Sequence, residues 1–393
     1  MQKHRVFWAS VLANLLTLLL LPEIAHAQVV TTVSCPPATG GTYSSITAAL
    51  NAVGLIGPRT FMVTGTCNEN VSLDEALSLT IAGAGGARIV APQDSDAFDI
   101  SRSQNITLQN LEIAGVLGSP PGSGGAGVLI TAASNVQINL CDIHDNGAVG
   151  VAAAGGSELF LNKTNIHNNN PGDGLDVAGG SSARVSGSTI QNNGSHGVLN
   201  LGNPASVTGG VGVFVVGNSF AAFPNDLIQN NADVGIMVYF GAEVNLGSTT
   251  IQDHNLDGIV VQQGGHLAVN GPALVQRNGG GCPPETPIAC GGIFGAGNAT
   301  VALNGVGAIS GNHGAGIFAE QGTNLHLNGA TISNNSGDGV HIRWISTADF
   351  RNFGGGANTI TGNGGASVFC DSRSLVIGDL TGFSKVNCGQ TSQ

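Results

Sequence analysis

The stretch between residues 142 and 200 gathers the side-chain types that acid–base chemistry requires. His144 and His167 stand 23 residues apart in matching contexts, Ile-His-Asp-Asn and Ile-His-Asn-Asn. Imidazole titrates near neutral pH, and a positioned imidazole or carboxylate can transfer a proton in a transition state. Such groups suit β-elimination or epimerisation of a uronate sugar, with a lysine neutralising the sugar carboxylate. The candidate catalytic residues are His144, Asp145, Lys163, His167, Asp173, Asp176 and His196, with Asp142 close by.

Two other interpretations of these residues stay open. The position of His144 and His167 continues along the chain as Gln191, Gln229 and Gln252, which is typical of a polar surface column. The aspartates of the segment Asn-Pro-Gly-Asp-Gly-Leu-Asp-Val could hold calcium with backbone carbonyls. Carboxylates at glycine turns also bond backbone amides. We expect no required cofactor, with calcium as an ion that these aspartates could hold.

A second set of residues has the composition of a sugar-binding surface. Aromatic rings stack on sugars, and planar polar side chains hydrogen-bond to them. In the alternative, Glu320 and Arg343 are an ordinary surface ion pair worth about 0–1 kcal/mol, and Trp344 packs beneath the C-terminal end. The candidate glycan-binding residues are Tyr239, Gln262, Phe318, Glu320, His341, Arg343 and Trp344, with Phe240 beside the tyrosine.

A repeat of about 23 residues, Ile-x-x-Asn-x-x-x-Gly-Val, must position both sets. The spacings from 143 to 166, from 228 to 251 and from 309 to 332 are each 23. A fixed period of this length indicates a solenoid, in which each unit buries its apolar face against its neighbours. The repeat begins at Ile143, Ile166, Ile190, Ile228, Ile251, Val275, Ile309, Ile332 and Ile360.

Each unit contains three short extended segments between glycine-rich turns, and none has helical periodicity. One unit shows them as Leu325 to Asn328, Thr331 to Ile332, and Gly339 to Ile342. Stacked in register, they make an all-β, single-stranded, right-handed parallel β-helix with three strands per coil and about a dozen coils. Neighbouring coils should lie about 4.8 Å apart.

Equal positions of successive coils form columns in such a stack. Two asparagine columns are predicted to form hydrogen-bonded ladders, because an amide is both donor and acceptor. The first column is Asn139, Asn162, Ser186, Asn245, Asn270, Asn304 and Asn328. The second is Asn146, Asn169, Asn193, Asn231, His254, Asn278, Asn312, Asn335 and Asn363.

A glycine column indicates either a positive φ angle or a close approach of coils. Its members are Gly150, Gly174, Gly197, Gly235, Gly258, Gly292, Gly316 and Gly339. Strand alternation points the second residue after each glycine outward. This mostly apolar column, either covered by an insertion or free as a binding strip, is Ala152, Asp176, Leu199, Met237, Val260, Phe294, Phe318 and His341.

The ends and insertions depart from the repeat. An amphipathic helix at Tyr43 to Val53 is predicted to cap the first coil and cover its strand edges. Insertions are expected at 118–125, at about 202–219 and at 279–290. Of seven cysteines, Cys141 is expected to stay a buried thiol. The predicted disulfides are Cys35–Cys67, Cys282–Cys290 and Cys370–Cys388.

Residues 1–27 have the charged start, short apolar core and small-residue cleavage site of a secretion signal. The remaining 28–393 form the β-helix, with an N-terminal cap at 28–60 and a disulfide-closed C-terminal cap at 370–393. We expect a secreted monomer, extracellular or periplasmic, without a membrane span. The formal net charge is −12, which argues against nucleic-acid binding because phosphate contacts need clustered cations.

This pattern resembles the right-handed parallel β-helix proteins of the pectin-lyase-like superfamily, over nearly all of the mature chain. The opening GGTYSSITAALNAV and the strand TFMVTGTCNENVSL are similar to the superfamily's N-terminal cap and first coil. The resemblance implies extracellular lyases, hydrolases, esterases or uronate epimerases acting on polysaccharides, and also adhesins. The chain lacks the Arg-x-Pro-x-x-Arg pattern of the lyases and the Asn-x-Asp, Asp-Asp, Gly-His-Gly, Arg-x-Lys series of the galacturonases.

Two functions follow as hypotheses. In the first, the secreted rod binds an extended polysaccharide or cell-surface glycan, or serves as an interaction module at the cell surface. In the second, it is a polysaccharide lyase or uronate epimerase. Activity on uronate polymers should then depend on His144 and His167.

Overall fold

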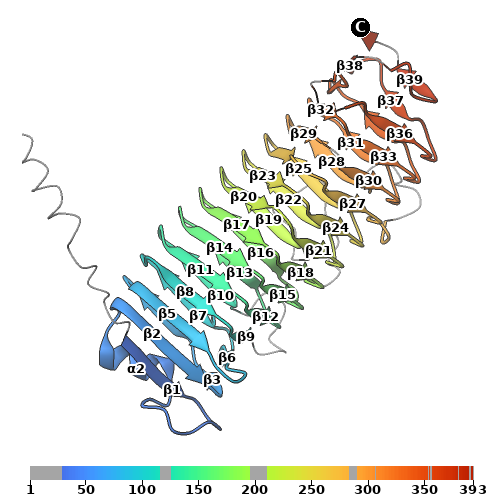
Figure 1. The fold of residues 1–393 in the computed structure, drawn as a ribbon. Helices are drawn as coiled ribbons and strands as arrows, with labels where there is room; N and C mark the ends of the chain where they lie inside the picture. The colour runs from blue at the N-terminus through green and yellow to red at the C-terminus, as the bar shows by residue number, and fades with distance from the viewer. Residues whose placement is uncertain are drawn as a thin grey trace, which may run out of the picture.

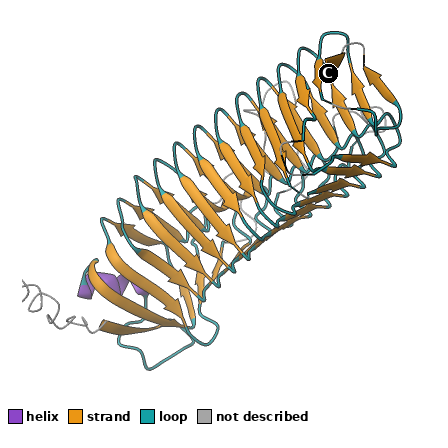
Figure 2. Cartoon of the chain, turned by 45° about the horizontal axis from the view of Figure 1, so that its top comes forward, coloured by secondary structure: helices purple, strands orange, loops and turns teal. Residues whose placement is uncertain are grey.

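The chain winds into a rod of stacked coils (Figure 1). The computed structural model describes residues 29–115, 125–194, 210–282, 290–305, 307–352, 354, 356–378, 380–388 and 391–392. The predicted signal at 1–27 and all but the last residue of the predicted insertion at 118–125 lie outside these residues. Figure 2 shows the rod curving gently, with the one helix of the described residues at its N-terminal end. Among the described residues no helix is long and apolar enough to cross a membrane.

Three parallel sheets run along the rod, and each coil contributes one strand to each sheet. This is the right-handed parallel β-helix that the repeat predicts, with three strands per coil.

The 15-stranded sheet contains β1 (Val29–Ser34), β2 (Ile56–Thr64), β5 (Leu77–Gly83), β8 (Ile106–Gln109), β11 (Asn135–Asn139), β14 (Glu158–Asn162), β17 (Ser182–Ser186), β20 (Phe220–Phe223), β23 (Glu243–Leu246), β26 (His266–Val269), β29 (Thr300–Asn304), β32 (Asn324–Asn328), β35 (Thr347–Asp349), β38 (Leu375–Ile377) and β40 (Thr391–Ser392).

The 12-stranded sheet contains β3 (Thr66–Asn68), β6 (Arg88–Val90), β9 (Glu112–Ala114), β12 (Asp142–His144), β15 (Asn165–His167), β18 (Thr189–Gln191), β21 (Leu227–Gln229), β24 (Thr250–Gln252), β27 (Leu274–Gln276), β30 (Ala308–Ser310), β33 (Thr331–Ser333) and β36 (Thr359–Thr361).

The 13-stranded sheet contains β4 (Val71–Asp74), β7 (Phe98–Ser101), β10 (Val128–Thr131), β13 (Val149–Ala153), β16 (Asp173–Ala178), β19 (Val213–Val216), β22 (Ile236–Tyr239), β25 (Ile259–Gln262), β28 (Ile293–Ala296), β31 (Ile317–Ala319), β34 (Val340–Ile342), β37 (Val368–Cys370) and β39 (Val386–Cys388).

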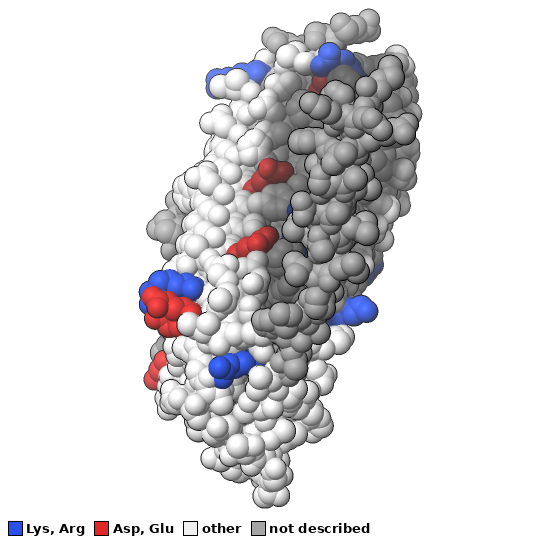
Figure 3. Space-filling view, turned by 60° about the vertical axis from the view of Figure 1, so that its left-hand side comes forward, with Lys and Arg blue, Asp and Glu red and all other residues white. Residues whose placement is uncertain are grey.

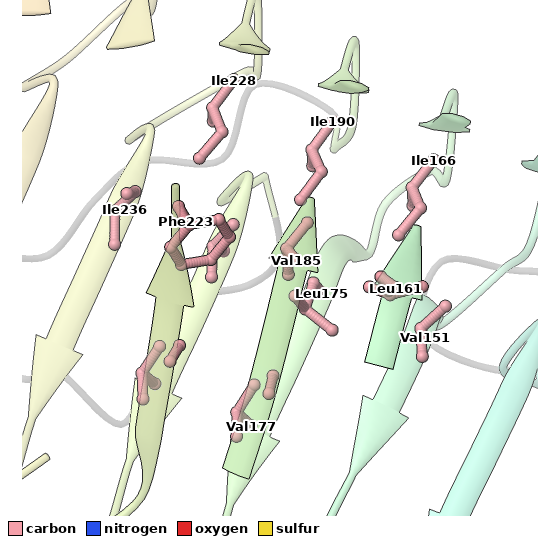
Figure 4. Close-up of a cluster of buried hydrophobic side chains, with 14 of the residues drawn as sticks. Val151, Leu161, Ile166, Leu175, Val177, Val185, Ile190, Phe223, Ile228 and Ile236 are labelled. Carbon is pink, nitrogen blue, oxygen red and sulfur yellow. The ribbon is translucent and has the colours of Figure 1, made fainter. Parts of the chain in front are cut away.

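The core is a stack of apolar side chains inside the coils. Each strand points alternate residues inward, and equal inward positions of successive coils lie one above another. Ile166, Ile190 and Ile228 illustrate one such row, and all three are fully buried (Figure 4). Burial of apolar surface along the whole rod is the main stabilising term.

The predicted capping helix forms, but it begins three residues later than expected. Helix α2 spans Ile46–Val53, and the Ser45 side chain caps it by accepting a hydrogen bond from Ala48 N at 3.1 Å. Tyr43 pairs instead with Val33 as an isolated β-bridge. Serine is a favoured helix N-cap, so the helix starts where its first amide groups find a partner.

All three predicted disulfides are present, and Cys141 is a buried free thiol. Cys35–Cys67 closes the first coil, and Cys370–Cys388 joins β37 to β39. The segment after Cys370 continues the coils, because β38 and β40 add the last strands of the 15-stranded sheet.

The second asparagine column is a buried hydrogen-bonded ladder, as predicted. Asn146 donates to Asn169 Oδ1 from its backbone N at 3.1 Å and from its Nδ2 at 2.8 Å. The same pattern recurs from Asn312 to Asn335 and from Asn335 to Asn363. These bonds satisfy turn backbone groups that the stack buries.

The first asparagine column forms part of the predicted ladder, on the outer surface and with long hydrogen bonds. Asn304 donates to Asn270 at 3.3 Å, and Asn270 donates to Asn245 at 3.3 Å. The register of Asn245 differs from the prediction: β23 and β26 pair Asn245 with Ala268, which leaves Gly247 opposite Asn270. Asn245 thus lies two positions earlier in register and still reaches Asn270, which a sequence count alone cannot show.

The glycine column reflects close approach of coils. Its described members have no positive φ angle. A Cβ added at Gly316 would lie 2.5 Å from Ile332 Cγ2 and 2.7 Å from the Gly339 carbonyl oxygen. The inward isoleucine and the ladder of the next coil therefore leave room for hydrogen alone.

In one coil, the residues predicted for the glycine column and the outward column are wrong. Gly212 occupies the glycine column, with its added Cβ 2.5 Å from Asn231 Nδ2 and 2.7 Å from the Gly235 oxygen. Phe214 pairs with Met237 and holds the outward position. The expected members Gly197 and Leu199 lie outside the described residues. The insertion therefore ends before residue 210, and residues 213–216 form β19 instead of belonging to it.

Candidate functional site

The 12-stranded sheet brings His144 and His167 together as predicted. Strands β12 and β15 pair them directly across adjacent coils. The two imidazole rings are stacked, with centroids 5.0 Å apart and planes inclined by 15°. Their side chains are 13% and 19% exposed, so solvent reaches them only at their edges.

Carboxylates hold both rings in place. His144 Nδ1 lies 2.8 Å from Asp145 Oδ2, and its Nε2 lies 3.2 Å from Glu112 Oε1. His167 Nε2 lies 2.9 Å from Asp142 Oδ1. Because both nitrogens of His144 are engaged, this ring is poorly placed to act as a general base. Glu112 is absent from the predicted set. Its position opposite Asp142, one coil earlier, is the signal that could have identified it.

Two other predicted members of this site are not brought to the rings. Lys163 lies in the turn between β14 and β15 with a φ of 50°. Among the described residues it makes no ion pair with the cluster. His196 lies outside the described residues.

The same outward position continues as a ladder of glutamines, which agrees with the polar-column interpretation. Gln229 donates to Gln191 at 2.8 Å, and Gln252 donates to Gln229 at 2.9 Å. Gln276 then donates to Gln252 at 2.9 Å. The histidine pair is thus the N-terminal continuation of a regular hydrogen-bonded surface column.

Asp173 and Asp176 lie on the 13-stranded sheet with Asp233, which the sequence did not predict. Asp173 Oδ1 accepts hydrogen bonds from the backbone N of Gly210 at 2.9 Å and of Val211 at 2.8 Å. This is the backbone bonding that glycine turns favour in aspartates. Asp233 stands two residues before its column glycine, so no column of the repeat relates it to the other two.

Burial dominates the electrostatics of these three carboxyl groups. It raises the pKa of Asp176 well above its usual value, and the nearby Asp173 raises it further. Burial, and then Asp173, raises the pKa of Asp233 to about 7. Asp176 keeps some exposed surface, but its Oδ1 is buried without a hydrogen-bond partner. A carboxyl group whose pKa is raised by burial in this way can act as a proton donor.

The outward column of the 13-stranded sheet is apolar and buried. Val211, Met237, Val260, Phe294 and Phe318 belong to one hydrophobic cluster outside the coils, and each is at most 7% exposed. The rings of Phe294 and Phe318 stack at 5.5 Å between centroids. This face is therefore a second core, and its buried side chains cannot form an open binding strip.

His341 extends the row of rings. Its imidazole lies between Phe318 at 5.0 Å and Phe369 at 4.4 Å, measured between centroids. Its Nδ1 is 2.8 Å from Asp338 Oδ2. His341 is 6% exposed, so it packs between these rings beneath the surface.

Glu320 and Arg343 form a more buried ion pair than the surface interpretation expects. Their side chains are 9% and 32% exposed, and Arg343 Nη2 lies 2.7 Å from Glu320 Oε2. The guanidinium lies between Phe318 at 4.7 Å and Trp344 at 4.2 Å. Trp344 itself is 44% exposed and does not pack beneath the C-terminal end.

Tyr239 and Gln262 are neighbours in the same column. The tyrosine hydroxyl donates to Gln262 Oε1, and burial raises the pKa of Tyr239 to about 12. Tyr239 is 4% exposed, whereas the adjacent Phe240 is 52% exposed.

The exposed aromatic residues gather at one corner of the rod. Phe240 and Trp344 are the only phenylalanine, tyrosine or tryptophan residues classed as exposed among those the structure describes. Both lie in the short turn between the 13- and 15-stranded sheets, with φ of 52° and 56°. Gln263 and Gln321 take the same turn position in coils between them and are also exposed. We call this line of turn residues the aromatic corner.

Comparison with known proteins supports the architecture. A family model described as the right-handed beta helix region matches residues 80–209. The A-module of the mannuronan C-5 epimerase AlgE6 from Azotobacter vinelandii superposes with a TM-score of 0.55 at 15% identity, covering 85% of this chain and 93% of that chain. The chain has a right-handed parallel β-helix fold.

Two further β-helix structures are similar at lower scores. The alginate lyase AlyF-OU02 has a TM-score of 0.46 at 11% identity, covering 93% of this chain and 88% of that one. The pectate lyase Pel9A has a TM-score of 0.42 at 13% identity, covering 93% and 80%. A search of curated protein sequences found no significant match. At these sequence identities the structural similarity shows a shared fold and carries no information on the chemistry of this chain.

Proposed function

We propose that this β-helix protein is secreted and binds an extended polysaccharide along the aromatic corner. The observation that carries the proposal is the turn at Trp344 and Ile345. Both residues adopt left-handed φ angles, 56° and 67°, and they are 44% and 73% exposed. A tryptophan and a β-branched isoleucine are costly in this conformation.

In other coils, glycine occupies the second position of this turn. Gly241, Gly264 and Gly322 stand where Ile345 stands, and glycine adopts positive φ without steric cost. Strained backbone costs on the order of 1–3 kcal/mol, and it concentrates at functional sites. Trp344 is only partly covered by Arg343, and Ile345 is mostly exposed, so burial compensates little for the strain and a binding role accounts for the pair best.

The corner has the dimensions of an extended chain. Phe240 and Trp344 are four coils apart, a separation of about 19 Å at the usual spacing between strands. Gln263 and Gln321 offer amide donors and acceptors between the two rings. Sugar rings could stack on the aromatic ends and hydrogen-bond to the amides between them.

The charged groups beside Trp344 already have partners. Arg343 is paired with Glu320, and Asp371 Oδ2 accepts a hydrogen bond from Trp344 N at 2.9 Å. The described part of the surface in Figure 3 carries only scattered charged side chains. Beyond Ile345, the next coil presents the exposed Arg373. Three disulfides fit an oxidising, extracytosolic compartment. The epimerase module that shares the fold is named for a polysaccharide, mannuronan, and the same ligand class is proposed here.

Replacing Trp344 by alanine should weaken polysaccharide binding by about tenfold or more, because one stacked ring is worth on the order of 1.4 kcal/mol. A glycan array with neutral and uronate polymers, followed by calorimetry on the best ligand, measures this. The matched control is Leu140→Ala, which removes another exposed apolar side chain from a left-handed turn at φ 55°. No binding by the native protein, or equal losses in both variants, would reject the aromatic corner.

The second candidate function is proton-transfer catalysis on a polysaccharide, as in a lyase or uronate epimerase. The observation that favours it is the carboxyl cluster at the 13-stranded sheet, where Asp176 Oδ1 is buried without a hydrogen-bond partner and Asp173 raises the pKa of both Asp176 and Asp233. A carboxyl group that stays protonated near neutral pH can serve as a general acid.

Asp176→Asn tests this candidate. Asparagine keeps the shape of the protonated acid but transfers no proton, so activity should fall by about 100-fold or more. Product release from neutral and uronate polymers measures it. Asp99→Asn, in the same outward column three coils earlier, is the control. Native protein without turnover on any polymer, or an active Asp176→Asn variant, would remove the catalytic candidate.

A further inference from the structure

We infer that the outer face of the 15-stranded sheet carries a separate binding site, for a small aromatic carboxylate. The site is a cavity of about 420 Å³ over β17, β20 and β23, with Arg184 at one end and Asn270 at the other. Cavities that bind small molecules measure about 300–1,000 Å³. This cavity lies on the face of a sheet, away from the line of turns in the aromatic corner, so it is independent of the polysaccharide proposal.

The cavity exists because small residues interrupt two outward columns of the sheet. Strand pairing places Arg184, Ala222 and Asn245 in one column, where Ala222 presents only a methyl group between two longer side chains. In the next outward column, Gly247 presents no side chain beside Asn270. The floor is therefore the flat face of the sheet, on which a flat apolar ring can lie. Most residues of this floor are apolar, namely Val185, Ala222, Phe223, Pro224 and Leu246.

Arg184 supplies a positive charge at the end of the cavity. Among the described residues it makes no ion pair, whereas five other arginines are paired with carboxylates. The paired arginines are Arg88, Arg102, Arg277, Arg343 and Arg351. Lys163 lies at the same end, because its Cγ is 3.6 Å from the position of a Cβ added at Gly187, the residue after Ser186 of the lining. A guanidinium binds a carboxylate in bidentate geometry, so charge complementarity favours a carboxylate here.

The polar side chains around the cavity are already engaged with one another. Asn270 Nδ2 donates to Asn245 Oδ1 at 3.3 Å, and Asn245 Nδ2 donates to Glu243 Oε1 at 3.0 Å. Ser186 Oγ donates to Asn225 Oδ1 at 3.0 Å. A sugar needs free donors and acceptors for its hydroxyl groups, and this rim offers few. An apolar ring that carries one carboxylate matches the cavity better, and this is the ligand class we assign to it.

The experiment is a calorimetric titration of the purified protein with cinnamate at neutral pH. We expect one saturable site with a Kd at or below about 1 mM, as is usual for a ligand of this size. Cinnamyl alcohol keeps the ring but lacks the charge, and glucuronate keeps the carboxylate but lacks the apolar ring. Each should bind about tenfold more weakly than cinnamate or worse, because each loses one of the two interactions.

Two variants test the two parts of the site. Arg184→Gln removes the charge and should weaken cinnamate binding by about tenfold or more. Ala222→Leu fills the cavity from an outward strand position and should abolish binding. The matched controls are Arg277→Gln, at an exposed arginine outside the cavity, and Ala302→Leu, at an outward alanine of β29 in the same sheet. Both controls should bind cinnamate like the native protein.

The proposal fails if the native protein shows no saturable binding of cinnamate, or if Arg184→Gln or Ala222→Leu keeps the native affinity. It fails equally if cinnamyl alcohol or glucuronate binds as tightly as cinnamate, because the charge or the apolar floor would then play no part. Circular dichroism and the unfolding midpoint establish that each variant is folded. Arg184→Gln should bind polysaccharide like the native protein, which separates this test from that of the aromatic corner.

Discussion

Gly316→Ala is expected to lower the free energy of unfolding by roughly 3 kcal/mol or more, because it overpacks a site with no free volume. The new Cβ would lie 2.5 Å from Ile332 Cγ2, 2.7 Å from the Gly339 oxygen and 2.8 Å from Asn335 Nδ2. The first contact is with a core side chain and the other two belong to the hydrogen-bonded stack. None of them can move without disturbing the next coil.

Chemical denaturation followed by circular dichroism measures this loss. The matched control is Gly280→Ala, because a Cβ at Gly280 meets no atom within 4 Å and its φ angle is not in the left-handed region. The control variant should keep the native midpoint. If both variants unfold at the native midpoint, close approach does not explain the glycine column.

Native protein is expected to lose up to about 3 kcal/mol of stability from His254 alone as the pH falls from 6.5 to 4. His254 is fully inside the asparagine ladder, and burial lowers its pKa to about 4. In the pH range between that value and the ordinary 6.5, the unfolded chain binds a proton that the folded chain rejects. Stability from this group is therefore complete above pH 6.5 and is lost as the pH falls through 4.

The ring takes the place of an amide in the ladder. His254 Nδ1 accepts from Asn231 N at 3.2 Å, and Nε2 donates to the Ile228 carbonyl oxygen at 3.2 Å. Both contacts require the neutral tautomer that carries its proton on Nε2. Protonation of Nδ1 would turn the acceptor into a donor facing a backbone N–H.

His254→Asn is the informative variant, since it restores the residue of the neighbouring coils. The difference in unfolding free energy between this variant and native protein should widen as the pH falls from 6.5 to 4. The comparison is needed because Asp226, Asp233 and Asp257 act in the opposite direction. Burial raises their pKa values to about 6, 7 and 7, so their contribution is lost as the pH rises. A pH-independent difference would contradict the role given to His254.

The repeat by itself determined the fold and much of its interior. A 23-residue period with three alternating segments permits few arrangements other than stacked coils. Positions that recur must meet the same neighbour in every coil. For that reason the buried ladder from Asn146 to Asn363, the stacking of His144 on His167, and the buried state of Cys141 could all be predicted.

Only the tertiary structure decided where the repeat is interrupted. The insertion before residue 210 transfers the column role from Gly197 and Leu199 to Gly212 and Phe214, because coil register depends on backbone pairing and not on sequence count. Asn245 lies two positions out of register with Asn270 for the same reason, although the two side chains still share a hydrogen bond. The sequence also left open why glycine recurs, and the structure shows a shortage of space between coils.

The burial or exposure of individual side chains was likewise decided only by the tertiary structure. Four residues predicted to point outward are each less than 8% exposed, whereas Trp344 is exposed to solvent. The four are Tyr239, Phe318, Glu320 and His341. Outward from a strand does not mean exposed to solvent when a second hydrophobic cluster forms on that face. Contacts between different columns, such as Glu112 with His144 or Asp233 with Asp173, depend on side-chain reach across turns. A linear period fixes which residues stack, but the packing of side chains between columns decides which of them a ligand can touch.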